Sequence, residues 1–275
     1  MTTGFDDLKG KTYIITGGAG ASAGGTGSAL TEKLCAFGAN VAVWDIADEA
    51  GEALCSRLTE DGFNTLYVHC DVREVSDVQN AVQATVERFG SVDGLVNNAF
   101  WHADMQPPLH EMTLDDWDAH MDINLRCHFI VCKYVIPELL HNKKSVILNI
   151  GSTGAHRGED GYFAYSAAKA GLEVLTRNIA AQYGRQGMKC NCLVPGLIVS
   201  EQFEQVIAEN EMLKSIFGKM DNNCLMPQGH TSGKAVADSA LFLLSDLSRD
   251  MTAQCIVLDG GTISHCPQWV DMRNS

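Results

Sequence analysis

The stretch Thr16-Gly17-Gly18-Ala19-Gly20-Ala21-Ser22-Ala23-Gly24-Gly25-Thr26-Gly27 decides the fold. It lies between the apolar segment Tyr13-Ile14-Ile15 and a segment predicted to be helical from Gly27 to Phe37. Glycines let the chain turn sharply and let a pyrophosphate approach the backbone, where the amino end of a helix favours its negative charge. Many glycine clusters are only flexible turns, but this position between strand and helix predicts a dinucleotide-binding βαβ unit.

The second predicted strand of that βαβ unit ends in a carboxylate. Asp45, 20 positions after Gly25, closes a predicted strand over residues 40–45 and is followed by Ile46. A carboxylate there can accept hydrogen bonds from the adenosine ribose and would repel a 2′-phosphate. No lysine or arginine occurs in residues 12–32 or 41–56. We therefore expect NAD as cofactor; the alternative is a solvated aspartate that merely ends a strand.

Apolar strand-like runs alternate with amphipathic stretches along the rest of the chain. This alternation predicts an α/β protein: a single-domain Rossmann fold over 1–275 with a doubly wound, seven-stranded parallel sheet and helices on both faces. The long connection 201–228 is expected to form a helical substrate lid. The further strands are expected at 65–70, 94–98, 145–150, 189–194 and 255–259. Further helices are expected at 47–61, 75–89 and 162–183, with one or two helices within 114–140.

Composition and charge exclude several classes of protein. The chain has 275 residues, of which 45% are hydrophobic, and this composition indicates a globular protein. Its net charge of −14 makes nucleic acid and anionic membranes poor partners. No apolar run approaches the roughly 20 residues that cross a bilayer, and residues 1–11 lack a signal-peptide core. We expect a cytoplasmic protein. Its ten cysteines form no CxxC pair, so buried thiols are expected rather than disulfides or a metal site.

The candidate chemistry centres on Tyr165 and Lys169, which lie four apart in YSAAK and so share one face of a predicted helix. A tyrosine pKa of about 10 is high for acid–base work near neutrality. A neighbouring ammonium and a positive nicotinamide ring would lower it. Such a pair alone is usually an ordinary surface pair. Here Ser152 follows one predicted strand, Asn98 another and Pro195-Gly196 a third, at the strand ends where α/β sheets bind ligands.

These motifs, in this order, resemble the short-chain dehydrogenase/reductase family over nearly the whole chain. The matching stretches are TGGAG…GGTG (16–27), CDV (70–72), NNA (97–99), DINL (122–125), Ser152 with YSAAK (165–169), PGLIVS (195–200) and VLDGG (257–261). The resemblance implies an NAD(P)-dependent oxidoreductase that interconverts alcohols and carbonyl compounds.

The resemblance also implies the role of each site residue. Tyr165 is the proton donor and acceptor, Lys169 lowers its pKa and holds the nicotinamide ribose, Ser152 orients the substrate oxygen and Asn124 helps to hold a proton-relay water. The residues expected to hold the cofactor are Gly17, Gly25, Thr26, Gly27, Asp45, Ile46, Asp71, Val72, Asn98, Ala99, Tyr165, Lys169, Pro195, Gly196, Ile198 and Ser200.

Two departures from the family pattern affect the cofactor site. The glycine loop carries four extra residues if Gly25-Thr26-Gly27 takes the place of the final GxG, and Phe100 stands where a glycine is usual. The ring of Phe100 either alters the nicotinamide pocket or packs beneath a loop.

The loops after the fourth and fifth strands are expected to shape the substrate pocket. Ser152, Trp101, His156 and Tyr162 are the predicted substrate residues; His102, Arg157 and Glu159 also flank the site. Apolar residues of the lid, Phe217 among them, could cover a substrate or simply pack on the core. A bulky apolar secondary alcohol such as a hydroxysteroid or bile acid is the expected substrate, with a 3-hydroxyacyl thioester or a small cyclic alcohol as alternatives.

Two further expectations concern assembly and the rival class of function. The helix expected at 162–183 has a wide face of small and apolar residues, and the resemblance implies pairing through it; we expect a homotetramer. The rival is a non-catalytic subunit that keeps the fold only for assembly or binding. The presence of Ser152, Tyr165 and Lys169 argues against this non-catalytic role, while the lengthened glycine loop is compatible with it.

Overall fold

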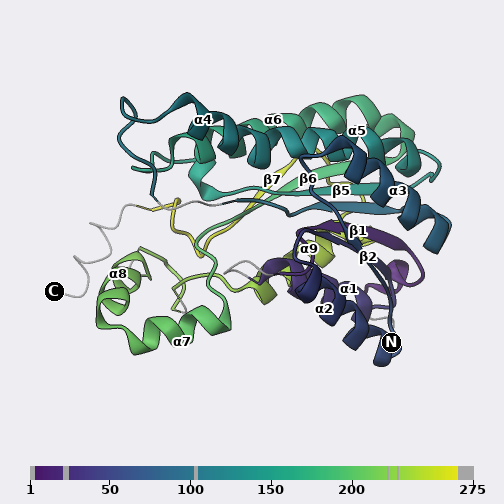
Figure 1. Cartoon of the computed structure of the whole chain (residues 1–275), viewed down its shortest axis with the longest axis horizontal. Coiled ribbons are helices and arrows are strands. Elements are labelled where there is room, and N and C mark those ends of the chain that lie inside the picture. The colour runs from purple at the N-terminus through teal and green to yellow at the C-terminus, as the bar shows by residue number, and fades with distance from the viewer. Residues whose placement is uncertain (1–3, 21–24, 102–104, 222, 228, 266–275) are drawn as a thin grey trace.

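A computed structural model shows seven parallel strands in one sheet, in the order β3-β2-β1-β4-β5-β6-β7 (Figure 1). It describes residues 4–20, 25–101, 105–221, 223–227 and 229–265. The predicted fold class is therefore confirmed. The strands are β1 (Thr12–Thr16), β2 (Asn40–Asp45), β3 (Asn64–His69), β4 (Gly94–Asn97), β5 (Ser145–Ile150), β6 (Met188–Pro195) and β7 (Cys255–Leu258).

Nine α-helices occur among the described residues, with short 3-10 segments between some of them. They are α1 (Thr26–Ala36), α2 (Asp48–Glu60), α3 (Val75–Phe89), α4 (Leu114–Met121), α5 (Cys127–Leu139), α6 (Phe163–Tyr183), α7 (Glu201–Glu209), α8 (Glu211–Asp221) and α9 (Gly233–Leu244). The segment 114–140, expected to contain one or two helices, forms two, α4 and α5, joined by a π-helical turn over Asp122–Arg126.

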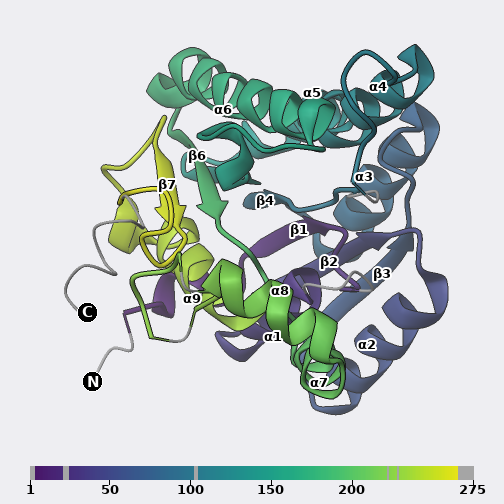
Figure 2. The same cartoon turned by 90° about the vertical axis from the view of Figure 1, so that its left-hand side faces the viewer.

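Two apolar clusters, one on each face, hold the sheet between layers of helices (Figures 1 and 2). Adjacent strand residues point to opposite faces: Ile15 packs with Leu34 and Leu241, from α1 and α9, whereas Ile14 packs with Val82 and Ile130, from α3 and α5. Because both faces are covered, every residue of β1 and of β5 is buried. The uninterrupted apolar runs in the sequence have this physical origin.

The strand order reverses between β1 and β4, and this topological switch point positions the site. Such sheets bind ligands in the crevice at the carboxyl ends of the two strands. Asn98, directly after β4, donates its side-chain amide to the carbonyls of Thr16 (3.1 Å) and Gly17 (3.0 Å). These bonds tie the start of the glycine loop to the end of β4.

The connection predicted as a lid does contain two helices, α7 and α8, which protrude from the body beyond the carboxyl end of β6 (Figures 1 and 2). The side chain of Ser200 caps α7 by accepting a hydrogen bond from the Phe203 amide at 3.2 Å.

The described cysteines are free thiols and most are buried, as expected from the sequence. No group of three or more potential metal ligands occurs among the described residues. In the described part of the chain, no helix has both the length and the apolar character that a membrane span requires.

Candidate active site

A cavity of about 520 Å³ opens at the carboxyl ends of β4, β5 and β6, and the three predicted catalytic side chains Ser152, Tyr165 and Lys169 line it together. Ser152 follows β5 and is the N-cap of a short 3-10 turn, where its hydroxyl accepts from the Gly154 amide at 3.1 Å. Tyr165 and Lys169 come from the first two turns of α6. The four-residue spacing places both on the face that meets β5.

The environment of Tyr165 opposes its ionisation. Burial raises the pKa of Tyr165 to about 12, while a hydrogen bond from Ser152 acts in the lowering direction. Glu159 and Tyr162 add smaller raising effects. The ammonium of Lys169 lies 5.8 Å from the centre of the tyrosine ring. Desolvation is therefore the largest effect on this pKa, and a lowering by Lys169 together with the nicotinamide ring stays a prediction.

Lys169 is 2% exposed, and its Nζ donates to the Ile150 carbonyl at 3.0 Å. Burial lowers the pKa of Lys169 to about 8. The ring of Phe100 lies under the same ammonium, 5.8 Å from Nζ to the ring centre. The residue that replaces the usual glycine therefore gives Lys169 a cation–π contact as well as a wall of the cavity.

Asn124 lies in the π-helical turn and is fully buried. Its side-chain amide donates to the carbonyls of Trp101 (3.0 Å) and His120 (3.1 Å), and its Oδ1 accepts from the Trp101 amide at 3.3 Å. Both N–H donors of Asn124 are thus used, which leaves only its carbonyl oxygens for the predicted relay water. The side chain itself fixes Trp101, whose ring stacks on His120 at 4.7 Å between ring centres.

A second cavity, of about 460 Å³, lies on the other side of the switch point and shares Asn98, Phe100 and Trp101 with the first. Seven predicted cofactor residues line it: Gly17, Asp45, Ile46, Asp71, Val72, Asn98 and Ala99. The two cavities together form a path from the end of β2 to Tyr165, as an extended dinucleotide requires.

The carboxylate of Asp45 is held in place at the end of β2. It accepts hydrogen bonds from the backbone amides of Ala19 (2.9 Å) and Ala47 (3.1 Å). One cation that was not expected from the sequence, Arg73, also lines this cavity. Its guanidinium is paired with both carboxylate oxygens of Asp71, at 2.6–3.1 Å.

The glycine loop fits a pyrophosphate where it is described. Gly25 has φ +58°, and among the described residues a Cβ added there would meet only the Ser200 side chain, at 3.9 Å. A Cβ on Gly27, in contrast, would collide with the Gly17 carbonyl, so glycine is required for the loop to pack on the helix. The inserted residues 21–24 lie outside the described part of the chain.

The nicotinamide end of the predicted cofactor site is also assembled. Thr26, Pro195, Gly196 and Ile198 line the catalytic cavity. Ser200 does not; it is buried beside Gly25 and caps α7.

Only some of the predicted substrate residues line the catalytic cavity. Trp101 and Tyr162 line the catalytic cavity, but His156 does not. Its Nε2 lies 2.6 Å from the carboxylate of Glu173 on α6, which holds the imidazole away from the cavity. Contact between His156 and the substrate stays a prediction. Arg157 and Glu159, joined by a hydrogen bond of 2.7 Å, line the cavity instead. His102 lies outside the described residues.

No described lid side chain lines the catalytic cavity. Phe203 and Phe217 pack edge to face at 5.6 Å between ring centres, and Val206, Met212 and Ile216 are 49%, 72% and 41% exposed. The lid helices thus pack partly on each other, and their closure over a substrate stays a prediction.

Comparison with known proteins agrees with this geometry. Residues 20–263 match the family model described as enoyl-(acyl carrier protein) reductase. The chain is 36% identical over 260 residues to the 2,5-dichloro-2,5-cyclohexadiene-1,4-diol dehydrogenase of Sphingobium indicum, covering 94% of this chain and 98% of that one. It is 34% identical to the 3-oxoacyl-[acyl-carrier-protein] reductase of Chlamydia pneumoniae, covering 92% and 97%.

Solved structures give the same result. A short-chain dehydrogenase/reductase from Burkholderia xenovorans superposes with a TM-score of 0.85 at 31% identity, covering 94% of this chain and 98% of that one. Levodione reductase superposes with a TM-score of 0.82 at 29% identity, covering 94% and 99%. The protein is an oxidoreductase that acts on CH–OH groups with a nicotinamide cofactor. The chain belongs to the short-chain dehydrogenase/reductase family.

Proposed function

We propose that the protein is an NAD-dependent dehydrogenase that interconverts a cyclic secondary alcohol and its ketone. The observation that carries the proposal is the single cavity in which Ser152, Tyr165 and Lys169 face the aromatic side chains of Phe100 and Trp101. The polar groups suit acid–base chemistry on a hydroxyl, and the aromatic wall suits an apolar ring.

NAD is the cofactor that the adenosine side favours. Asp45 presents a fixed carboxylate to the cavity where the ribose is expected. The neighbouring cation, Arg73, is already paired with Asp71. The carboxylate of Asp71 therefore offsets the positive charge that would attract a 2′-phosphate.

A nicotinamide cofactor held by residues such as Asn98, Pro195 and Ile198 would supply the hydride-accepting chemistry for oxidation of the carbinol carbon. The side chains of the protein supply the proton chemistry. The Ser152 hydroxyl orients the substrate oxygen and bonds to Tyr165, and the ionised Tyr165 removes the hydroxyl proton. The buried ammonium of Lys169, held by the Ile150 carbonyl, stabilises the phenolate and has N–H groups left for ribose hydroxyls.

A substrate with one or two rings agrees better with the site than the four-ring steroid expected first. The cavity of about 520 Å³ has to hold the nicotinamide end as well as the substrate. Two relatives bear names of enzymes that act on single rings, a cyclohexadienediol and levodione. Arg157 and Glu159 on the cavity wall also favour a substrate with a second polar group.

A substrate screen tests this proposal. Purified protein is supplied with NAD and a panel of cyclohexanediols, bicyclic terpene alcohols, hydroxysteroids, 3-hydroxyacyl thioesters and sugars. The highest kcat/KM is expected for one- or two-ring alcohols. Higher efficiency on steroids or thioesters would replace the substrate class, and no turnover on any alcohol despite NADH binding would favour a non-catalytic role.

A further inference from the structure

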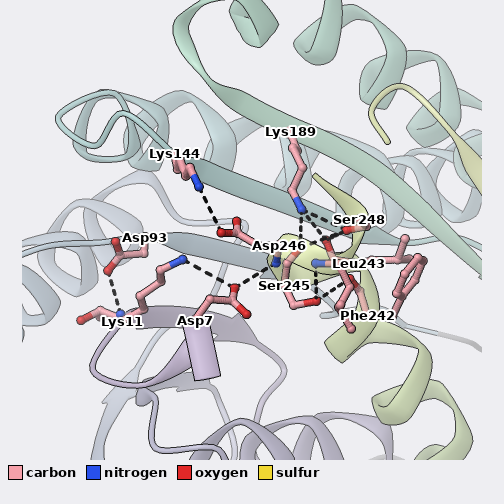
Figure 3. A network of polar contacts seen from close by, with 12 residues as sticks. Asp7, Lys11, Asp93, Lys144, Lys189, Phe242, Leu243, Ser245, Asp246 and Ser248 are labelled. Carbon is pink, nitrogen blue, oxygen red and sulfur yellow. Dashed lines mark hydrogen bonds and ion pairs between the residues drawn. The ribbon is translucent and has the colours of Figure 1, made fainter. Parts of the chain in front are cut away.

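A second site lies at the end of the sheet opposite the catalytic cavity, where basic side chains gather around a cavity of about 230 Å³ (Figure 3). We call it the basic cavity; its charged lining comprises Lys11, Lys143, Lys144, Lys189, Arg249, Asp93 and Asp246. Five of the 20 lysines and arginines of the chain thus meet at one place, although the net charge of the chain is −14.

The position of the basic cavity separates it from the cofactor site. Tyr13 and Ser145, at the amino ends of β1 and β5, line it together with Leu244 at the carboxyl end of α9. All strands of the sheet are parallel, so their amino ends lie at the edge opposite Ser152 and Pro195. No residue lines both this cavity and the catalytic one.

Lys189 forms the fixed part of the site. Its Nζ donates to the carbonyls of Ser245 (2.7 Å) and Leu243 (3.3 Å) and to the Ser248 hydroxyl (3.0 Å), as Figure 3 shows. These acceptors lie at the carboxyl end of α9, where the helix dipole favours a cation. Among the residues that the structure describes, no carboxylate pairs with Lys189, so its charge is not cancelled by direct contact.

The acidic residues around the basic cavity do not balance its cations. Asp246 is 3.0 Å from the Lys144 ammonium, and Lys144, Lys11 and Lys189 all act to lower its pKa. The Lys11 ammonium also lies 3.8 Å from Asp7 (Figure 3), so the carboxylates of Asp7, Asp93 and Asp246 stand against four lysines and Arg249. Asp93 accepts the Thr12 amide at 2.9 Å.

The remaining cations of the basic cavity are Lys143 and Arg249. Lys143 is exposed and has no ion-pair partner within the described ranges, and Arg249 has only the exposed Asp250 at 3.7 Å. The backbone carbonyl of Lys143 packs closely on Gly187, where an added Cβ would collide with it. The site therefore combines the hydrogen-bonded ammonium of Lys189 with the exposed side chain of Lys143 and with Arg249.

We propose that the basic cavity binds a small ligand through a phosphate group with at least two negative charges, separately from the cofactor. Lysine ammonium groups are common phosphate ligands, and Lys144 can turn from Asp246 toward a bound anion because both partners are partly exposed. Binding would connect the N-terminal segment, the start of β5 and the end of α9.

Calorimetric titration with inorganic pyrophosphate tests the proposal. The protein is saturated with NADH, so that the cradle of the cofactor pyrophosphate is occupied, and ionic strength is matched with sodium chloride. Saturable binding of one pyrophosphate per chain is expected. Lys144→Gln is expected to weaken it about tenfold, since it removes one charge-assisted hydrogen bond, and to leave NADH affinity and turnover unchanged.

Lys33→Gln is the matched control. Lys33 is also an exposed lysine in an ion pair, with Asp238 at 2.5 Å, but it lies on α1 outside the basic cavity. This variant is expected to bind pyrophosphate within twofold of the wild type. Absence of saturable binding to the wild-type holoenzyme, or equal weakening by both substitutions, would overturn the proposal and leave the lysines as a network that only stabilises the fold.

Discussion

Replacement of Asp45 by serine is expected to remove most of the discrimination against NADP. A 2′-phosphate at contact distance from a carboxylate, about 4 Å, is disfavoured by about 4 kcal/mol per charge pair near a protein surface. That energy corresponds to roughly a thousandfold in the dissociation constant. Wild-type protein should therefore bind NADH at least a hundredfold more tightly than NADPH, since Arg73 in the same cavity is held by Asp71.

The substitution acts on both cofactors. Asp45→Ser relieves the repulsion of NADPH and also removes the hydrogen bonds that the ribose hydroxyls would donate to the carboxylate, which weakens NADH binding by about tenfold. The ratio of the two dissociation constants should fall below ten. Adding Asp71→Asn frees Arg73 for the phosphate and should reverse the preference.

Quenching of protein fluorescence by NADH and NADPH measures these constants. Asp48→Asn is the control, because Asp48 carries a similar charge three residues on but bonds to Tyr67 and His69 and does not line the cavity. It should change either constant less than twofold. Wild-type dissociation constants within threefold of each other would refute the assignment of Asp45.

Three further outcomes follow from the geometry. Ser152→Ala removes the hydrogen bond that lowers the pKa of Tyr165. Because oxidation needs the phenolate, the rise of kcat/KM with pH for the oxidation reaction should move up by about one pH unit. A pH profile that does not move would argue against that bond. Asn124→Ala frees the Trp101 backbone and should raise KM for the alcohol severalfold, with NADH affinity unchanged; steady-state kinetics that show KM unaltered would contradict this positioning role. The protein should be a tetramer, since Phe129 on α5 and Val174 on α6 are 54% and 49% exposed; light scattering that shows a monomer at micromolar concentration would refute this.

The sequence predicted the sheet well because its strands are buried on both faces. The observed limits of β2 and β5 are the predicted ones, Asn40–Asp45 and Ser145–Ile150. Such strands appear in sequence as unbroken apolar runs bounded by polar residues. The catalytic residues could be assigned for a related reason: strand ends and a four-residue helical spacing are local features that fix where a side chain lies.

Contacts between distant segments could not be predicted in this way. The direction of His156 is set by Glu173, 17 residues on and on another element. Arg73 reaches the cavity near Asp45 because β3 pairs with β2, although the two residues lie far apart in the sequence. The π-helical turn at Asn124 has the same apolar pattern as an α-helix, so periodicity alone does not distinguish the two.

The pKa of Tyr165 is a second property that could not be predicted from the sequence. The spacing to Lys169 indicated a lowered pKa, but the sequence does not reveal how strongly the fold desolvates the phenol. In the folded protein, desolvation outweighs the Ser152 hydrogen bond and raises the pKa to about 12. The sign of the net effect therefore depends on packing.

Turnover by Tyr165→Phe tests the central claim most directly. Phenylalanine keeps the buried ring and removes only the hydroxyl that transfers the proton. With a substrate found in the screen, kcat should fall at least about a hundredfold, the usual contribution of a positioned acid–base group. The dissociation constant of NADH, measured on the same preparation, should stay within threefold of the wild type. A variant that binds NADH and keeps most of the wild-type rate would contradict the assignment of Tyr165 as the proton-transfer residue.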